Sequence, residues 1–309
     1  MRYFPLGKSG LRVSAVGVGC LNLCKMDEGS LDALMEAALE CGVNFFDHAD
    51  IYGGGESEKV FGRLLKRKAG LREKILIQSK CGIRKEPAGT YYDFSKAYIL
   101  SSVDGILARL GIDCLDVLVL HRPDPLMEPD EVAEAFAHLR AGGKVRHFGV
   151  SNFNAAQLRL LQEALPEPLV TDQLQFSLMH TGMLDHALRA NTELPGSEDR
   201  DGGVLDYCRL NGITVQAWSP FQHGHFGGPF LDNPDFPELN RALEEVGSAH
   251  GLTATGAAAA WILRHPAKIQ LMAGTTKAFR LKEICAAADI TLSRPEWGRL
   301  YCAAGNSFL

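Results

Sequence analysis

The sequence lacks the features that identify several classes of protein. It has no long run of one charge, because 32 Lys and Arg residues are mixed with 37 Asp and Glu residues. This pattern argues against a nucleic-acid-binding surface and a polybasic membrane patch. The N-terminus has no apolar signal-peptide core, and no segment reaches the roughly 18 uninterrupted apolar residues of a membrane span. We therefore expect a cytoplasmic protein whose partner is a small molecule.

Closely spaced cysteines are also absent, although the chain has eight cysteines. None of them belongs to a C-x-x-C pair or has the tight spacing of a zinc ribbon. We therefore expect reduced thiols and no bound metal. The eight positions are Cys20, Cys24, Cys41, Cys81, Cys114, Cys208, Cys285 and Cys302.

What the sequence does contain is an alternation of short apolar runs with longer segments of helical period. Many of the longer segments begin with Ser, Asp or Asn and end in Gly, as capped helices do. Such alternation is typical of parallel strands joined by helices. The eight candidate strands span residues 15–19, 43–49, 74–80, 115–121, 145–151, 169–176, 213–219 and 269–274.

Eight strands in this alternation predict an α/β fold of the (β/α)8 type, a TIM barrel. A doubly wound sheet is disfavoured, because no G-x-G-x-x-G follows an early strand. Residues 2–13 are expected to form an N-terminal β-hairpin that closes the barrel floor, and an insertion at 183–203 is a candidate loop over the top. No Pro- or Ser-rich linker divides the chain, so we expect a single domain over residues 1–309.

Polar side chains stand at or just after the C-terminal ends of the expected strands, where barrel enzymes build their active sites. Such residues are often only solvated boundaries. A Lys or His directly after an apolar run, however, is partly desolvated and needs a partner. Because these residues occur on consecutive strands, we expect them to converge on one face. They are Asp47, Tyr52, Lys80, His121, Ser151, Asn152, Gln173, Trp218 and Ser219.

Four of these residues form a set suited to proton transfer. The pKa of a phenol is about 10, and an ammonium beside it lowers that pKa by stabilising the phenolate. Lys80 is expected to act in this way on Tyr52. Asp47 would hold the ammonium charged, and His121 would hydrogen-bond a substrate oxygen beside the phenol. The set suits protonation of a carbonyl oxygen as negative charge develops there.

Reduction of a carbonyl also needs a source of hydride, and the remaining strand ends suit a nicotinamide cofactor. Ser151, Asn152 and Gln173 offer hydroxyl and amide groups to a carboxamide. Trp218 offers a flat face for ring stacking, although core packing is about as frequent a role for such a residue. After the eighth strand, hydroxyl and cationic side chains gather at the start of a helix, which favours a phosphate. They are Thr275, Thr276, Lys277 and Arg280.

These residues lie in stretches that make the chain resemble the aldo-keto reductases from end to end. The matching stretches are LGKSGLRVSAVGVG, GVNFFDHADIYGGGESEKVFG, ILIQSKCGI, LARLGIDCLDVLVLHRPDP, GKVRHFGVSNF, GITVQAWSPF and GTTKAFRLKE. The motifs DHADIYGG, SKCGI and HRPDPLM are similar to those of a bacterial oxidoreductase subgroup. The resemblance implies a (β/α)8 barrel that reduces aldehydes or ketones with NAD(P)H, usually NADPH.

The resemblance also implies a role for each matching position. Asp47, Tyr52, Lys80 and His121 fall on the family's catalytic tetrad, with Tyr52 as the general acid. We expect NADPH rather than NADH, because the loop after the eighth strand matches the family's contacts to the adenosine 2′-phosphate. The implied cofactor contacts are Ser151, Asn152, Gln173, Trp218, Ser219, Pro220, Phe221, Thr275, Thr276, Lys277, Arg280 and Glu283.

The sequence does not identify the natural carbonyl substrate. His48 stands where many family members have Thr or Ser, and it is a candidate substrate contact or a residue that only packs beside the site. Tyr91 and Tyr92, in a segment where family loops diverge, are further candidates, although exposure on a surface loop is nearly as frequent a role for such aromatics. Asp50 is expected to be an acceptor that stabilises its loop. A monomer is the default expectation.

Two other functions are considered beside carbonyl reduction. His223 and His225 offer two imidazoles to a metal-dependent barrel hydrolase, but no third ligand accompanies them convincingly. A cofactor-binding regulatory or redox-sensing protein with little turnover is the second alternative, since some relatives of the family have such roles. The four filled tetrad positions favour a reductase over both.

Overall fold

The computed structural model describes residues 1–87, 89–189 and 197–308, and eight of its strands form a closed parallel barrel. Each of the eight expected runs overlaps one barrel strand, so the predicted (β/α)8 fold is confirmed. The barrel strands are β3 (Val16–Gly19), β4 (Phe45–Asp47), β5 (Leu76–Cys81), β8 (Leu115–Leu120), β9 (Val145–Ser151), β10 (Thr171–Gln175), β11 (Thr214–Trp218) and β12 (Gln270–Ala273).

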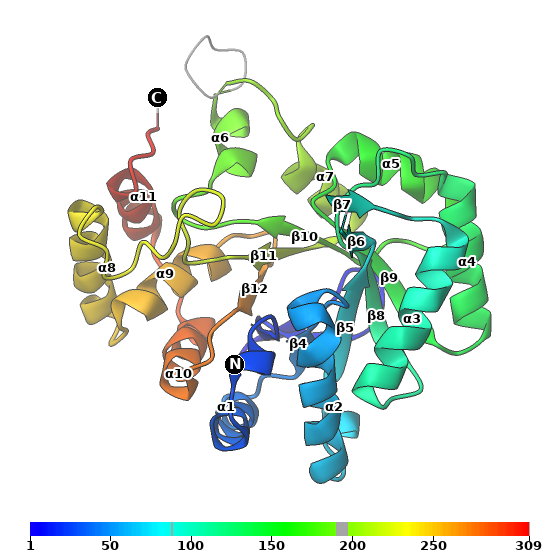
Figure 1. Ribbon diagram of the computed structural model, residues 1–309. Coiled ribbons are helices and arrows are strands. Elements are labelled where there is room, and N and C mark those ends of the chain that lie inside the picture. Colours follow the sequence, from blue (N-terminus) through cyan, green and yellow to red (C-terminus); the bar gives the residue numbers. More distant parts are fainter. Residues whose placement is uncertain (88, 190–196, 309) are drawn as a thin grey trace.

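Helices surround the barrel on the outside (Figure 1). Those that follow the first six strands are α1 (Glu28–Glu40), α2 (Glu56–Arg67), α3 (Lys96–Leu110), α4 (Pro129–Ala141), α5 (Ala155–Ala164) and α7 (Val204–Asn211). The ring is completed by α9 (Ala254–Leu263) and α10 (Ala278–Ala286). Additional helices are α6 (Gly182–Leu188), α8 (Pro237–Ala249) and α11 (Arg294–Ala303).

An antiparallel hairpin of β1 (Tyr3–Pro5) and β2 (Arg12–Ser14) closes the N-terminal end of the barrel, as expected. Leu6 and Val13 are fully buried against a cluster of inward-facing side chains that includes Phe45 and Met272. Burying each of these aliphatic side chains contributes about 2 kcal/mol. The turn needs glycine at Gly7, where φ is +50° and a Cβ would overlap the carbonyl of Val170.

The start of α5 follows closely on the end of barrel strand β9 and is held by its own side chains. Asn154 Oδ1 accepts a hydrogen bond from the backbone N–H of Gln157 at 2.9 Å, and Gln157 Oε1 accepts one from the N–H of Asn154 at 3.0 Å. Such a capping box stabilises a helix by about 1 kcal/mol. The box lies directly after the end of β9, where Ser151 and Asn152 stand at the mouth of the barrel.

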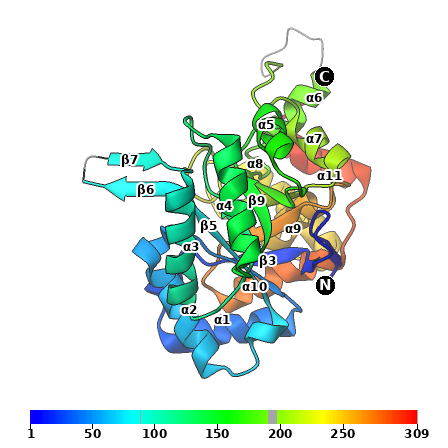
Figure 2. The same ribbon diagram turned by 90° about the vertical axis from the view of Figure 1, so that its right-hand side faces the viewer.

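The segment at 82–94 forms a second hairpin rather than an irregular loop. Strands β6 (Ile83–Glu86) and β7 (Gly89–Tyr92) pair antiparallel with each other and project from the barrel (Figure 2). Phe94 at its base is buried and stacks on Phe153, with ring centroids 6.4 Å apart. The hairpin is thus tied to the core at its base while its strands stand beside the mouth of the barrel.

The expected insertion at 183–203 is described only in part. Its first residues belong to α6, residues 190–196 lie outside the described part of the chain, and the segment from 197 leads into α7. In the described ranges, no helix combines the length and the apolar character that crossing a membrane requires.

Candidate active site

Lys80, at the end of β5, lies at the centre of a buried polar cluster. Its Nζ donates to Asp47 Oδ1 at 2.7 Å and Oδ2 at 2.8 Å, and to the carbonyl of His48 at 2.8 Å. The hydroxyl of Tyr52 lies 3.1 Å from the same nitrogen. Burial lowers the pKa of Lys80, but the charges of Asp47 and Tyr52 and the hydrogen bonds outweigh it and hold the pKa above its ordinary value. The side chain is therefore a buried ammonium.

Tyr52 reaches Lys80 because three glycines follow it. Gly53, Gly54 and Gly55 have φ angles of 59°, 65° and 89°, in the left-handed region that other residues rarely adopt. A Cβ at Gly55 would also lie 2.7 Å from Cδ of Arg109. A sharp turn therefore leads from the barrel rim into α2, and it holds the phenol at the barrel mouth.

The pKa of Tyr52 corrects one expectation from the sequence. Burial raises this pKa, the charge of Lys80 lowers it, and the charge of Asp47 raises it, so that it lies above the ordinary 10.0. Desolvation therefore outweighs the effect of the ammonium, which the sequence could not weigh. The hydroxyl is protonated at neutral pH, as a proton donor must be.

His121 follows β8 and stands edge-on to Tyr52, with ring centroids 6.0 Å apart. Burial lowers the pKa of the imidazole well below its ordinary value, and the charges of Lys80 and Arg122 add to this shift. The ring is therefore neutral at neutral pH. Its Nδ1 has no hydrogen-bond partner among the described residues. A neutral imidazole carries a single N–H, which it can donate to an oxygen.

Two buried glutamines complete the hydrogen bonding of Asp47. Gln78 Nε2 donates to Asp47 Oδ1 at 2.7 Å, and Gln173 Nε2 donates to Oδ2 at 3.2 Å. The same two nitrogens donate to Gln216 Oε1, at 2.9 Å and 3.1 Å. Each carboxylate oxygen thus accepts one hydrogen bond from Lys80 and one from a glutamine, which satisfies a charge that would otherwise be costly to bury.

The chain of amides continues down the barrel axis. Gln216 Nε2 donates to Gln270 Oε1 at 3.0 Å, and Gln270 Nε2 donates to the carbonyl of Ser14 at 2.8 Å. Gln78, Gln216 and Gln270 were not among the site residues predicted from the sequence. A glutamine within an apolar strand is the signal that could have indicated them, because a buried amide requires hydrogen-bond partners.

The residues expected to hold a carboxamide lie together at the ends of β9, β10 and β11. Ser151 Oγ donates to the carbonyl of Gln173 at 2.7 Å, and Asn152 Nδ2 donates to Ser151 Oγ at 2.7 Å. Trp218 Nε1 donates to Asn152 Oδ1 at 3.1 Å. Asn152 has a φ of +64°, and its side chain also reaches the carbonyl of His121 at 3.3 Å. The network connects these groups to the loop that carries His121.

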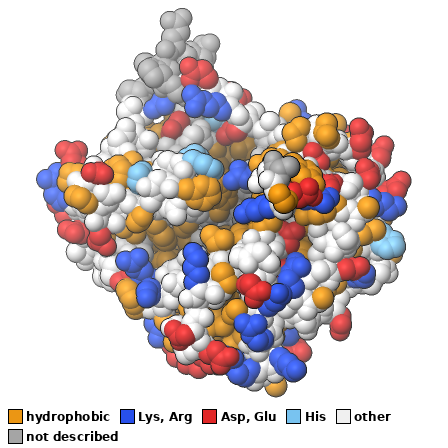
Figure 3. Space-filling view, viewed as in Figure 1, with side chains coloured by type: hydrophobic (Ala, Val, Ile, Leu, Met, Phe, Trp, Pro, Cys, Tyr) orange, Lys and Arg blue, Asp and Glu red, His pale blue; other side chains and the backbone are white. Residues whose placement is uncertain are grey.

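Trp218 is partly exposed and contacts side chains from two other loops. Phe226 stacks on its indole with ring centroids 5.8 Å apart, and His225 meets it edge-on at 6.4 Å. The guanidinium carbon of Arg122 lies 5.5 Å from the centre of the indole. The face in Figure 3 is hollowed near its centre, where hydrophobic side chains gather, with Lys and Arg side chains nearby.

The other predicted cofactor contacts occupy two loops. Ser219, Pro220 and Phe221 follow β11 directly, and Ser219 has a φ of +49°. The segment after β12 leads into α10, where Thr275 Oγ1 accepts from the backbone N–H of Lys277 at 3.1 Å. The expected contacts in this second loop and the helix are Thr275, Thr276, Lys277, Arg280 and Glu283.

The model of the aldo/keto reductase family matches residues 15–302. The chain belongs to this family. A solved structure of the thermostable aldo-keto reductase Tm1743 has the same fold, with a TM-score of 0.76 and 27% identity over 98% of this chain and 100% of that chain. The protein is therefore an NAD(P)H-dependent oxidoreductase that acts on carbonyl groups.

Two curated aldo-keto reductase relatives are similar over most of the chain. The uncharacterized oxidoreductase YcsN of Bacillus subtilis is 39% identical, over 93% of this chain and 92% of its own length. The 6-dehydroglucose reductase of Agrobacterium fabrum is 37% identical, over 89% of this chain and 87% of its own length. These names give the reaction class but not the substrate of this reductase.

The structure corrects the expectation for His48, whose ring is buried away from the active site of the reductase. It lies against Phe61 of α2 at 4.5 Å between ring centroids, and neither ring nitrogen has a partner in the described ranges. Burial lowers its pKa to about 3. Because adjacent residues of a strand point to opposite faces, the inward position of Asp47 turns His48 outward. Only its carbonyl, which accepts from Lys80, belongs to the site.

Tyr91 and Tyr92 are exposed on β7, with 42% and 38% of their surface accessible. Tyr91 donates its hydroxyl to Glu86 Oε1 at 2.7 Å across the hairpin. Arg84 lies 5.3 Å from the centre of the Tyr91 ring. These contacts of Tyr91 stabilise the hairpin itself, which fits the surface role considered for this residue.

Asp50 lies behind the site, where its carboxyl accepts a long hydrogen bond from Tyr98 at 3.5 Å. Its other oxygen has no partner among the residues that the structure describes. Burial and the charge of Glu58 raise the pKa of Asp50 to about 7. Its backbone N–H also donates to the carbonyl of Lys80 at 3.0 Å. Its contacts thus fit the expected role in the loop.

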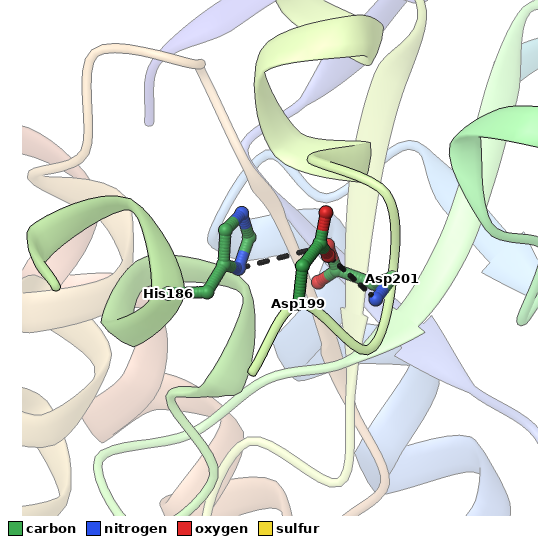
Figure 4. A group of neighbouring side chains, drawn as sticks. All are labelled: His186, Asp199 and Asp201. Carbon is green, nitrogen blue, oxygen red and sulfur yellow. Dashed lines mark hydrogen bonds and ion pairs between the residues drawn. The ribbon is translucent and has the colours of Figure 1, made fainter. Parts of the chain in front are cut away.

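Within the described ranges, one group of three possible metal ligands lies together: His186, Asp199 and Asp201 (Figure 4). It contains neither His223 nor His225, the pair considered from the sequence. Its carboxylates already accept backbone hydrogen bonds, since Asp199 Oδ1 accepts from Gly202 at 2.7 Å and Asp201 Oδ1 from Gly203 at 2.9 Å. These hydrogen bonds close the turn that leads into α7, and this role accounts for the group.

Proposed function

We propose that this aldo-keto reductase uses NADPH to reduce an aldehyde or ketone to an alcohol, with Tyr52 as the proton donor. The observation that carries the proposal is the buried ammonium of Lys80 at 3.1 Å from the Tyr52 hydroxyl, held by both oxygens of Asp47. A buried cation beside a protonated phenol stabilises the phenolate that remains after the proton is given up.

Each residue around the phenol has a separate role in proton transfer. A substrate oxygen that accepts from Tyr52 also lies within reach of the N–H of neutral His121, so two donors hold it. As negative charge develops on that oxygen, the proton moves from Tyr52, and Lys80 compensates the phenolate. Asp47 keeps the ammonium in place throughout.

The donor groups on the other strand ends fit a nicotinamide dinucleotide. Asn152, Ser151 and Gln173 would hold the carboxamide, and Trp218 would lie against the ring. Lys277 and Arg280 are exposed and have no ion pair among the described residues, which suits a 2′-phosphate and favours NADPH over NADH. The cofactor, when bound, supplies the hydride.

The name of the Agrobacterium relative suggests a substrate class for this reductase. That protein is a 6-dehydroglucose reductase and is 37% identical. A sugar that carries an aldehyde is a small, hydroxylated carbonyl compound, and we propose this class for the present chain. We further propose a monomer, with one barrel domain, in the cytoplasm. All eight cysteines are free thiols, which is consistent with a reducing compartment.

A cofactor-binding sensor with little turnover is the second candidate, and one experiment separates it from a reductase. NADPH oxidation is followed with a panel of aldehydes, ketones, quinones and sugars, for the wild type and for Tyr52→Phe. We expect Tyr52→Phe to lower kcat by about a thousandfold or more, because the proton donor is lost, and to leave the Kd of NADPH nearly unchanged. Undiminished turnover in this variant would refute Tyr52 as the acid. Tight NADPH binding without turnover of any compound would favour the sensor.

A further inference from the structure

Arg122 stands beside the reacting centre, directly after His121. Its guanidinium carbon lies 5.5 Å from the centre of the Trp218 indole, across the barrel mouth. Burial lowers the pKa of the guanidinium, and the phenols of Tyr92 and Tyr52 partly offset this effect. The charge of Arg122 also contributes to the lowered pKa of His121. The side chain therefore lies close to the groups that would hold the carbonyl oxygen.

This guanidinium lacks the partners that other partly buried arginines have. Arg72 pairs with Asp116 at 2.9 Å, and Arg109 pairs with Glu58 at 2.7 Å. Arg122, by contrast, has no ion pair and no hydrogen bond to any residue in the described part of the chain. Its guanidinium instead lies over the face of the Trp218 indole. A guanidinium has five N–H donors, and a cation–π contact does not satisfy them.

A partly desolvated donor set next to an active site is expected to meet its acceptors on the ligand. The predicted cofactor contacts lie on the ends of β9 to β12 and on α10, whereas Arg122 follows β8. The free donors of Arg122 therefore lie between His121, which it follows directly, and Trp218, at the border between the substrate and cofactor sides of the mouth. The indole beneath the guanidinium restricts its position, which reduces the entropy lost on binding.

We propose that Arg122 donates hydrogen bonds to an oxygen of the substrate beyond the reacting carbonyl, and that it thereby selects hydroxylated aldehydes of the sugar type. The inference rests on the proposed function and adds to it the residue that sets specificity. An aldehyde without a second oxygen leaves the guanidinium with no acceptor in the mouth, so its binding gains nothing from Arg122. A carboxylated aldehyde offers the same kind of acceptor with a charge.

The test compares glyceraldehyde with propanal, which has the same carbon chain without the hydroxyl groups. We expect Arg122→Met to lower kcat/KM for glyceraldehyde by about ten- to a hundredfold, mainly through KM, because hydrogen bonds from a charged donor are lost. For propanal we expect a change of less than about twofold. Arg140→Met is the matched control, because Arg140 pairs with Glu167 away from the mouth. This control variant should change kcat/KM for neither glyceraldehyde nor propanal.

A second measurement does not depend on turnover. Saturation-transfer NMR of glucose, the alcohol that reduction of 6-dehydroglucose would yield, should show contact with the wild type and a clear loss with Arg122→Met. Equal losses of kcat/KM for glyceraldehyde and propanal would overturn the inference, since Arg122 would then act on the common chemistry. A larger loss for succinic semialdehyde than for glyceraldehyde would overturn the preference for hydroxyl groups. The proposed function would not be affected by either result, as long as the wild type reduces these aldehydes and Tyr52→Phe does not.

Discussion

Gln78 Nε2 lies 2.7 Å from Asp47 Oδ1, and both side chains are buried inside the barrel. A carboxylate can only accept hydrogen bonds, so Gln78 must turn its NH2 group toward Asp47 and its oxygen away. Gln173 is oriented in the same way. Gln216 fixes both orientations, because its Oε1 accepts from both amides. The carboxylate of Asp47, at the upper end, therefore sets the orientation of every amide in the chain.

Replacing Gln216 with Leu should weaken the positioning of Asp47. The amides of Gln78 and Gln173 lose their shared acceptor, so neither is held toward the carboxylate. We expect a decrease in kcat of about ten- to a hundredfold and a loss of about 2 kcal/mol in the free energy of unfolding. Steady-state kinetics with NADPH and urea unfolding measure the two effects.

Gln270→Met is the matched control for this variant. It removes an amide from the same chain, but one that contacts Gln216 and Ser14 rather than the partners of Asp47. It should lower stability by a similar amount and change kcat by less than about threefold. If both variants lost kcat equally, the amides would support the barrel in general and not Asp47 in particular.

Replacing Arg280 with Ala should weaken the binding of NADPH much more than that of NADH. The reason is that only NADPH carries the 2′-phosphate that we assign to Arg280 and Lys277. We expect an increase of about ten- to a hundredfold in the Kd of NADPH and less than about twofold for NADH, measured by tryptophan fluorescence. Lys282→Ala is the control, since Lys282 on the same helix pairs with Glu40. Equal losses for both cofactors would place the phosphate elsewhere.

Replacing Asp50 with Asn should make the protein less sensitive to pH. The pKa of Asp50 is raised from 3.8 to about 7, so the folded state binds this proton more tightly than the unfolded state does. The stability that this carboxyl contributes is fully present below about pH 4 and is lost as the pH rises toward 7. Relative to Asp50→Asn, the wild type should therefore lose up to roughly 4 kcal/mol between pH 4 and pH 8.

Urea unfolding at about pH 4 and about pH 8 measures this difference. Asp27→Asn provides a control whose effect should be nearly the same at these two pH values. Hydrogen bonds from the backbone N–H and hydroxyl of Ser30 lower the pKa of Asp27, so its contribution is present above its unfolded pKa and lost as the pH falls. An Asp50→Asn effect that is the same at both pH values would show that the carboxyl titrates normally.

The sequence by itself determined the barrel and the approximate position of the site. Apolar runs of strand length, separated by capped helices, leave few ways to bury both faces of eight parallel strands. The side chains at the strand ends must then converge, which is why Asp47, Lys80 and Tyr52 could be grouped in advance. The three glycines after Tyr52 favour a sharp turn, because few other residues adopt a positive φ.

Only the tertiary structure decided how those groups are solvated and paired. Desolvation outweighs the ammonium at Tyr52, and strand alternation turns the ring of His48 into the core. The sequence also could not show that Gln78 and Gln216 meet across the barrel, or that Arg122, beside Trp218, has no hydrogen-bond acceptor among the residues that the structure describes. These properties depend on distances between residues that are far apart in the chain. Burial makes the electrostatic interactions over such distances strong, because the interior screens charges less than water does.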